Sequence, residues 1–299
     1  MATSRVVADS LPFRWDLVTP DQLGSLLDDS VAPDLSFLDD LVACTGKVLA
    51  RSGDGDLIFV GRSLDSMFDL LGGVLAGSAR AQRLHRLPLS FQRPAIGCDP
   101  RYRRFRRRPL TSEEVAQGRR FLAAVGLAPH ALARRDRPAV LVDVVDGGGT
   151  FTELFTLVRD WIDEEREPWP VIRRKLRFVG VTSRCKTSPN TYRWQQHAAW
   201  TQTLPAAAVA NVSLERWVWS YFGDHQVKLT RSFRPDRWTA EAEGPDRDER
   251  TRQALTEAAA LVAYGRSRAG RQAVARAVGR DPALSHPWLR TLVTNLATG

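Results

Sequence analysis

The chain has 299 residues, of which 43% are hydrophobic, enough for a folded core, yet it has no apolar run long enough for a membrane helix or a signal peptide, so we expect a globular cytoplasmic protein. Its formal charge is +9, but only four of its 43 basic residues are lysines, an arginine bias typical of GC-rich genomes, so the charge is weak support for nucleic-acid binding. The cysteines Cys44, Cys98 and Cys185 have no metal-ligand spacing, which argues against a structural zinc and a disulfide framework.

The first third of the chain predicts an arm followed by the start of an α/β sheet. Residues 1–33 contain three prolines and one short helical pattern, and we expect them to lie as an arm on the main domain. Apolar residues then recur at helical spacing over 35–48. Residues 57–60 form a continuous apolar run, as expected for a strand buried on both faces of a parallel sheet, and a helix over about 65–75 follows.

The next stretch contains a weaker strand candidate and an exposed segment. Residues 84–91 are the strand candidate, and 92–109 contain three prolines and six arginines between 101 and 108. So many charges are difficult to bury, and we predict an exposed loop there. Residues 111–125 begin with Thr and two Glu, a pattern typical of a capped helix start.

The clearest α/β unit lies in the middle of the chain. Residues 139–142 predict a buried strand, 143–150 a turn and 151–165 a helix, and 176–181 supply a further strand. Strands that alternate with helices at this spacing predict a parallel sheet with right-handed crossovers.

Beyond residue 182 aromatic residues become frequent, and helices are expected over about 246–264, 267–278 and 286–297. The run Trp217 to Phe222 either packs in the core, which we favour, or forms a hood over a nucleobase. We therefore divide the chain into an arm (1–33), an α/β domain (34–240) and a helical tail (241–299).

The turn after the central strand has the chemistry of an anion site. Asp143 ends the strand, and Asp146 precedes Gly147, Gly148, Gly149 and Thr150, which opens a helix. Glycines allow backbone N–H groups to converge on a phosphate, and the helix N-terminus adds partial positive charge. The Gly-Lys-Ser/Thr ending of a Walker A loop and the GxGxxG spacing of dinucleotide folds are both absent from this turn.

This turn resembles the phosphoribosyl-pyrophosphate signature of type I phosphoribosyltransferases, in which a hydrophobic strand leads to two acids and a phosphate-binding loop ending in Thr. The resemblance covers roughly residues 35–182 and implies an α/β fold with a parallel-sheet phosphoribosyltransferase-like core, extended here by an N-terminal arm and a C-terminal helical, Trp-rich segment. It implies that Asp143 contacts ribose hydroxyls, that residues 146–150 hold the 5-phosphate, and that Asp146 acts on the incoming base. The first acidic position of the signature is Val142 in this chain.

Two further segments follow the order of that family. Gly61, Arg62 and Ser63 fall where the family has its pyrophosphate loop, and an arginine fork suits phosphate oxygens. The arginine run, with Arg103 and Arg104 as candidate pyrophosphate contacts, occupies the place of the family's flexible loop. We expect the two loops at 61–63 and 146–150 to flank one cleft.

The resemblance implies transfer of phosphoribose from phosphoribosyl pyrophosphate to a nitrogenous base, with Mg²⁺ bound through the ligand's pyrophosphate and no metal site of the chain's own. A nucleotide is an alternative ligand and a nucleobase the implied acceptor. Two other function classes stay open: a non-catalytic domain that senses the same ligand, which the Val142 departure favours, and a nucleic-acid binder. The oligomeric state, a homodimer among the options, is left open by the sequence.

Overall fold

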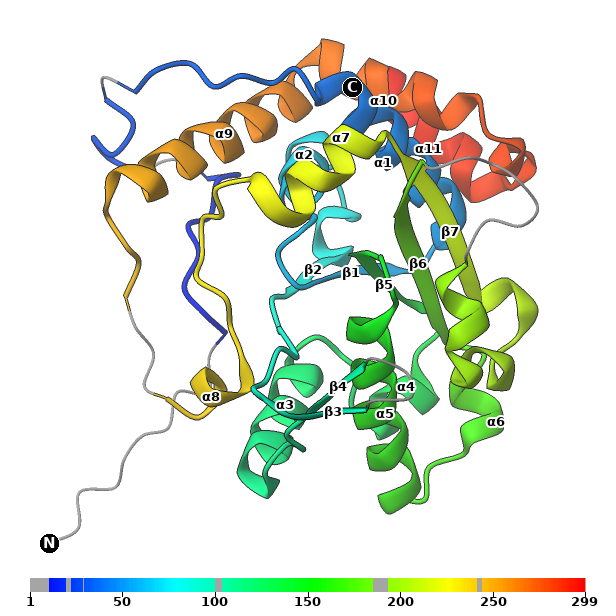
Figure 1. Cartoon of the computed structure of the whole chain (residues 1–299). Helices are drawn as coiled ribbons and strands as arrows, with labels where there is room; N and C mark the ends of the chain where they lie inside the picture. Colours follow the sequence, from blue (N-terminus) through cyan, green and yellow to red (C-terminus); the bar gives the residue numbers. More distant parts are fainter. Residues whose placement is uncertain are drawn as a thin grey trace, which may run out of the picture.

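The computed structural model describes residues 11–19, 23–28, 30–99, 104–184, 193–240 and 244–298. Its centre is a five-stranded sheet in which every pair of neighbours is parallel, in the order β2-β1-β5-β6-β7 (Figure 1). The strands are β1 (Asp56–Val60), β2 (Leu84–Leu87), β5 (Ala139–Val144), β6 (Leu176–Ser183) and β7 (Val209–Leu214). The parallel α/β sheet expected from the sequence is confirmed.

Both faces of the sheet are covered, which explains why its central strands have unbroken apolar runs. Along β5 the side chains alternate: Val140 and Val142 belong to one core cluster, whereas Ala139 and Leu141 belong to the other. All four are buried. The sheet therefore separates two hydrophobic layers.

The first layer contains α1 (Leu38–Ser52) and α2 (Asp65–Val74), and the C-terminal helices α9 (Glu249–Arg266), α10 (Arg268–Gly279) and α11 (Pro287–Thr298) lie against them (Figure 1). The helices approach closely at glycines. A Cβ atom on Gly265 would lie 2.4 Å from the carbonyl oxygen of Leu70, and one on Gly46 would lie 2.7 Å from Cβ of Ala277. The C-terminal helices thus share a core with the sheet.

The second layer contains α3 (Ser112–Ala124), α4 (Pro129–Arg134), α5 (Gly149–Glu164), α6 (Trp169–Ile172) and α8 (Pro235–Trp238). α3 begins with the capping box expected from the sequence, in which the Thr111 side chain accepts from the N–H of Glu114 and the Glu114 carboxylate accepts from the N–H of Thr111. The Trp-rich stretch forms three short 3₁₀ helices, η3 (Trp194–His197), η4 (Ala199–Thr203) and η5 (Ala206–Ala208), before β7.

Residues 11–19 lie across α2 and α9. Trp15 and Leu17 are buried against Leu255 and Ala258 of α9. The Arg14 guanidinium donates from Nη2 to both oxygens of Asp69 in α2, at 2.7 Å each, and both side chains are buried. This part of the N-terminal arm is therefore fixed to the helical layer by apolar contacts and by a buried ion pair.

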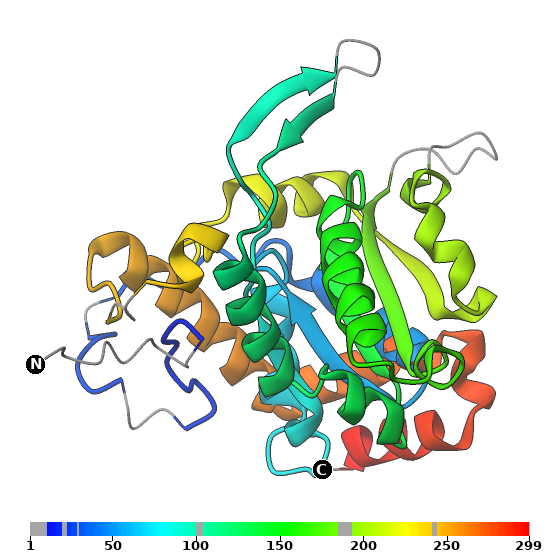
Figure 2. The ribbon, with the colours of Figure 1, turned by 90° about the horizontal axis from the view of Figure 1, so that it is seen from below.

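Two elements differ from the sequence-based expectation. The exposed loop expected over 92–109 instead contains an antiparallel hairpin of β3 (Ala95–Asp99) and β4 (Arg104–Arg107), which projects from the body of the molecule (Figure 2). Pairing of the two strands joins backbone N–H and C=O groups across the ribbon. β7 was not anticipated at all. No helix in the described part of the chain is both long and apolar enough to cross a membrane.

Candidate functional site

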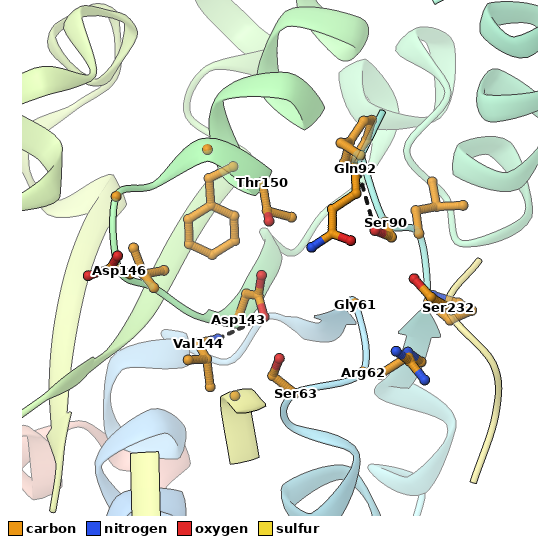
Figure 3. A pocket seen from close by; sticks show the side chains of 18 of the residues that line it. Gly61, Arg62, Ser63, Ser90, Gln92, Asp143, Val144, Asp146, Thr150 and Ser232 are labelled. Carbon is orange, nitrogen blue, oxygen red and sulfur yellow. Dashed lines mark hydrogen bonds between the residues drawn. The ribbon is translucent and has the colours of Figure 1, made fainter. Parts of the chain in front are cut away.

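The two glycine-containing loops meet in one cavity of about 620 Å³. The loop at 61–63 follows β1, the loop at 146–150 follows β5, and β1 and β5 are neighbours in the sheet. Both loops line the cavity (Figure 3). The prediction that they flank one cleft is confirmed, and the cleft lies at the carboxyl ends of the strands, where open α/β sheets bind their ligands.

The loop after β5 presents backbone donors at the start of α5. Gly148 has φ of 76°, a left-handed conformation that favours glycine, and is the N-cap of α5 without offering a side-chain cap. Within the described part of the chain, the N–H groups of Gly149, Thr150 and Phe151 make no hydrogen bond. Free N–H groups at the start of a 16-residue helix suit an anion.

Of the three loop glycines, Gly148 alone is crowded. A Cβ atom there would lie 2.5 Å from Cε3 of Trp194, whereas one on Gly147 or Gly149 would meet no atom within 4 Å. Trp194 is buried and donates from Nε1 to Oδ1 of Asn211 in β7, at 2.7 Å. The Trp-rich segment therefore packs against the 146–150 loop through Trp194.

Asp143 lies at the floor of the cavity with 5% of its surface exposed. Burial raises the pKa of its carboxyl group well above the usual range, although the N–H of Val144, 2.8 Å from Oδ1, and the positive charge of Lys228 oppose the shift. Val142, at the signature's first acidic position, is fully buried in the opposite core layer and does not line the cavity. The strand thus contributes one carboxyl group to the site.

Asp146 and Thr150 also line the cavity, and Asp146 is exposed. In Figure 3 Asp146 lies on the side of the cavity opposite Arg62 and Ser232. Asp143 lies between them. The two aspartates therefore contribute to separate parts of the pocket, as roles on different portions of a ligand would require.

The loop after β1 is held firmly. Gly61 has φ of 70°, and its N–H donates to the carbonyl of Leu87 in β2 at 2.9 Å. Directly behind it, Asp65 opens α2 and accepts two hydrogen bonds from Arg86 of β2, both 2.9 Å long. This bidentate, buried ion pair fixes the start of α2 behind the loop.

The sequence predicted that Arg62 contacts pyrophosphate, but in the structure its side chain also bonds to the protein backbone. Its side chain lines the cavity, but its guanidinium donates from Nη1 to the carbonyl oxygen of Thr230. Burial lowers the pKa of Arg62, and the nearby charge of Asp65 opposes that shift. The side chain can still offer its remaining donors to an anion. Arg103 lies outside the described residues, and Arg104 begins β4.

Several lining residues were not singled out from the sequence. Lys228 is the most notable of them: it donates to the carbonyl oxygen of Phe222 at 2.8 Å and to Oε1 of Gln226. Burial lowers its pKa to about 8, although Asp65 opposes the shift. One signal pointed to it, since lysine is rare in this arginine-rich chain. The other polar ones are Ser90, Gln92, Asp224, Gln226, Ser232 and Arg234, while Arg107, which also lines the cavity, belongs to the arginine run singled out from the sequence.

A network connects the cavity to α9. Gln226 donates from Nε2 to Oγ of Ser66 at 2.6 Å and also to the carboxylate of Glu257 in α9. The Tyr221 hydroxyl donates to the same carboxylate at 2.7 Å. Residues far apart in the chain thus fix the segment that carries Lys228.

The cavity contains oxygen atoms that could coordinate a magnesium ion bound to the phosphates of a ligand. Carboxyl groups of Asp143, Asp146 and Asp224 line it, and Mg²⁺ prefers oxygen ligands. Among the described residues no group of three or more His, Cys, Asp or Glu side chains is arranged to hold a metal by itself. The donor set fits a metal that is shared with a phosphate ligand.

Comparison of the chain with protein-family models, curated proteins and solved structures returned no match.

Proposed function

We propose that this protein is a phosphoribosyltransferase-like protein that binds phosphoribosyl pyrophosphate in the cavity between the two loops and transfers its phosphoribosyl group to a nitrogenous base. The observation that carries the proposal is the meeting of the loops after β1 and β5 around the buried Asp143. A phosphate loop alone would fit many ligands. A second loop and a carboxyl group between them fit a sugar that carries phosphate at both ends.

Each part of the cavity then has a task. The N–H groups of 147–150 and the N-terminus of α5 bind the 5-phosphate. Asp143 accepts hydrogen bonds from ribose hydroxyls, and this requires the charged carboxylate, which the positive charge of Lys228 favours. Arg62, Arg107 and Lys228 lie on the remaining wall, where they stabilise the charge of the pyrophosphate.

Mg²⁺ would be held by the pyrophosphate together with Asp143 and Asp224, and when bound it neutralises charge on the leaving group. Binding the phosphate at one end and the pyrophosphate at the other positions the anomeric carbon for an incoming nitrogen. Asp146, exposed at the far side of the cavity, would orient that base or accept its proton.

A second function is favoured by Val142. Because its side chain points into the core, the ribose would meet one carboxylate where the family signature has two acids. Weaker binding of the ribose is compatible with a domain that senses the ligand without catalysing its reaction. In that case the ligand binds to the same loops, and no base is consumed.

Titration with phosphoribosyl pyrophosphate and MgCl₂, followed by thermal shift, tests the binding. Ligand at about ten times its Kd should stabilise the fold by about 1.4 kcal/mol. Release of pyrophosphate in the presence of a panel of nucleobases then separates transfer from sensing. An unchanged melting temperature at millimolar ligand would refute the proposal.

A further inference from the structure

A second cavity, of about 590 Å³, adjoins the proposed phosphoribosyl site. Gln92, Arg107 and Arg234 line both cavities, so the two are continuous. The walls of the second cavity contain four arginines, Arg93, Arg107, Arg108 and Arg234, and a single acid, Asp236. Arginines therefore outnumber acids four to one among the lining residues.

Two of these arginines are already neutralised, and two are not. Arg108 makes a two-pronged pair with Glu114, at 2.6 and 2.8 Å, and Arg93 pairs with Glu153 at 2.8 Å. Arg107 and Arg234 are exposed and have no ion pair within the described residues. They are the two arginines at the junction of the cavities.

Arg93 contributes a buried guanidinium to the wall of the second cavity. Its side chain is 5% exposed, its Nε donates to the carbonyl of Arg108 at 2.6 Å, and its Nη2 donates to Glu153. Its Nη1 is buried and has no hydrogen-bond partner in the described structure. Its other two nitrogens hold the guanidinium in place, so a positive charge is fixed in the wall of this cavity.

Together the two cavities, of about 620 and 590 Å³, offer more room than a pyrophosphate fills. Arg107, which lines both, stands at the end of β4, where the chain leaves a hairpin that projects from the body (Figure 2). A ligand that contacts the phosphate loop in the first cavity and Arg107 and Arg234 at the junction must carry more than one phosphate.

We propose that the two cavities and the base of the hairpin bind a single-stranded nucleic acid, with its 5′-terminal phosphate on the loop at 147–150 and its backbone along Arg107 and Arg234. This inference rests on the proposed function for the phosphate loop and for Arg107, whereas Arg93 and Arg108 line the second cavity alone. The 5′ end of a polynucleotide strand would then be a ligand of this site in addition to phosphoribosyl pyrophosphate.

The test measures fluorescence anisotropy of a 3′-labelled single strand of about 12 nucleotides, as RNA and as DNA, with and without a 5′-phosphate. The double variant Arg107→Gln/Arg234→Gln should weaken binding about tenfold or more. It should also reduce the slope of log K against log salt by about 1.4, since each phosphate contact to a single strand contributes about 0.7. Removing the 5′-phosphate should weaken binding to the wild type.

Arg268→Gln, a change of an exposed arginine on α10 outside both cavities, is the matched control and should bind as the wild type does. Two results would overturn the proposal: no strand binding at low salt, or strand binding that the double variant leaves unchanged. If the double variant weakens inorganic pyrophosphate but no strand binds, the cavity serves the leaving group, and the nucleic-acid inference fails while the proposed function stands. Titration of phosphoribosyl pyrophosphate into the wild type tests that function separately.

Discussion

Asp143 is held in a position that favours binding over stability. A buried carboxyl group whose folded-state pKa is raised binds its proton more tightly in the folded than in the unfolded chain. Its contribution to stability is therefore fully present below the unfolded pKa of about 3.9 and is lost as the pH rises toward the folded pKa. At neutral pH, where this group is ionised in the unfolded chain, its burial costs the fold free energy.

We predict that Asp143→Asn stabilises the unliganded protein at pH 7 while impairing binding. The amide keeps the acceptor for the N–H of Val144 but carries no charge. The gain should be on the order of 1 kcal/mol, or a melting temperature higher by about 2 °C. Phosphoribosyl pyrophosphate should bind about tenfold more weakly, because charge-assisted hydrogen bonds to the ribose are lost. A less stable variant with unchanged affinity would contradict this role.

Lys228 makes a pH-dependent prediction. Its pKa of about 8 lies below the unfolded value of about 10.4, so its ammonium group loses its proton first in the folded protein. A bound pyrophosphate interacts with the charged form. Relative to Lys228→Met, wild-type affinity for pyrophosphate should be about tenfold higher at pH 7, and this advantage should disappear between about pH 8 and pH 10.

Isothermal titration at several pH values measures this difference, and using the ratio of the two proteins cancels the titration of pyrophosphate itself. Lys47→Met, on α1 outside the cavity, serves as the control and should follow the wild type at every pH. If the ratio of the two pyrophosphate affinities does not change with pH, Lys228 has only a structural role.

At this scale the sequence indicated the acids but not the base that faces them. Asp143 and Asp146 were singled out because a strand, a glycine run and a helix surround them in the sequence. Lys228 lies 85 positions after Asp143 in a segment without a recognisable motif, and its position depends on contacts with Ser66 and Glu257 through Gln226. Such long-range contacts have no local pattern.

Among the elements, the β5–loop–α5 unit depends on one glycine. Gly148→Ala should destabilise the fold by about 2 kcal/mol or more, because a left-handed alanine is strained and its Cβ would contact the buried ring of Trp194. Gly147→Ala, which meets open space, is the matched control and should unfold as the wild type does. Chemical denaturation compares the two variants, and equal losses would show that crowding by Trp194 has no effect.

The same unit shows which elements sequence patterns can predict. β1 and β5 are apolar on both faces and end at glycine loops, so their patterns are strong. β7 is an edge strand with small, partly exposed residues, and it is stabilised by pairing with β6 and by the Trp194–Asn211 hydrogen bond. The hairpin of β3 and β4 lacks the apolar alternation of a half-buried strand, so its arginines predicted a loop.

In the molecule as a whole, the helices of the C-terminal segment complete the core instead of forming a separate tail. The sequence indicated three helices there, and all three are confirmed, but amphipathic patterns do not identify the surface that a helix covers. The structure places Leu261 of α9 and Val274 of α10 in one cluster with Leu70 and Val48. The division of the chain at residue 241 followed composition, which does not report such contacts.

The close packing of α9 on α2 gives a prediction at this scale. Gly265→Ala should destabilise the protein by about 2 kcal/mol, because its Cβ would lie 2.4 Å from the backbone oxygen of Leu70 and force the helices apart. Gly279→Ala, at the end of α10 in open space, should be neutral or slightly stabilising, since alanine favours helix. Equal melting temperatures for the two variants would show that this crossing tolerates separation.

The shared core also has a consequence for synthesis of the protein. While the ribosome is still translating the chain, α1, α2 and the sheet emerge well before residues 249–298, so the apolar surface that α9, α10 and α11 cover stays open on the nascent chain. Exposed apolar surface at that stage favours aggregation and chaperone binding. We therefore expect a ribosome-bound intermediate ending near residue 245 to be sensitive to protease, and resistance to develop only after α9 has emerged from the exit tunnel.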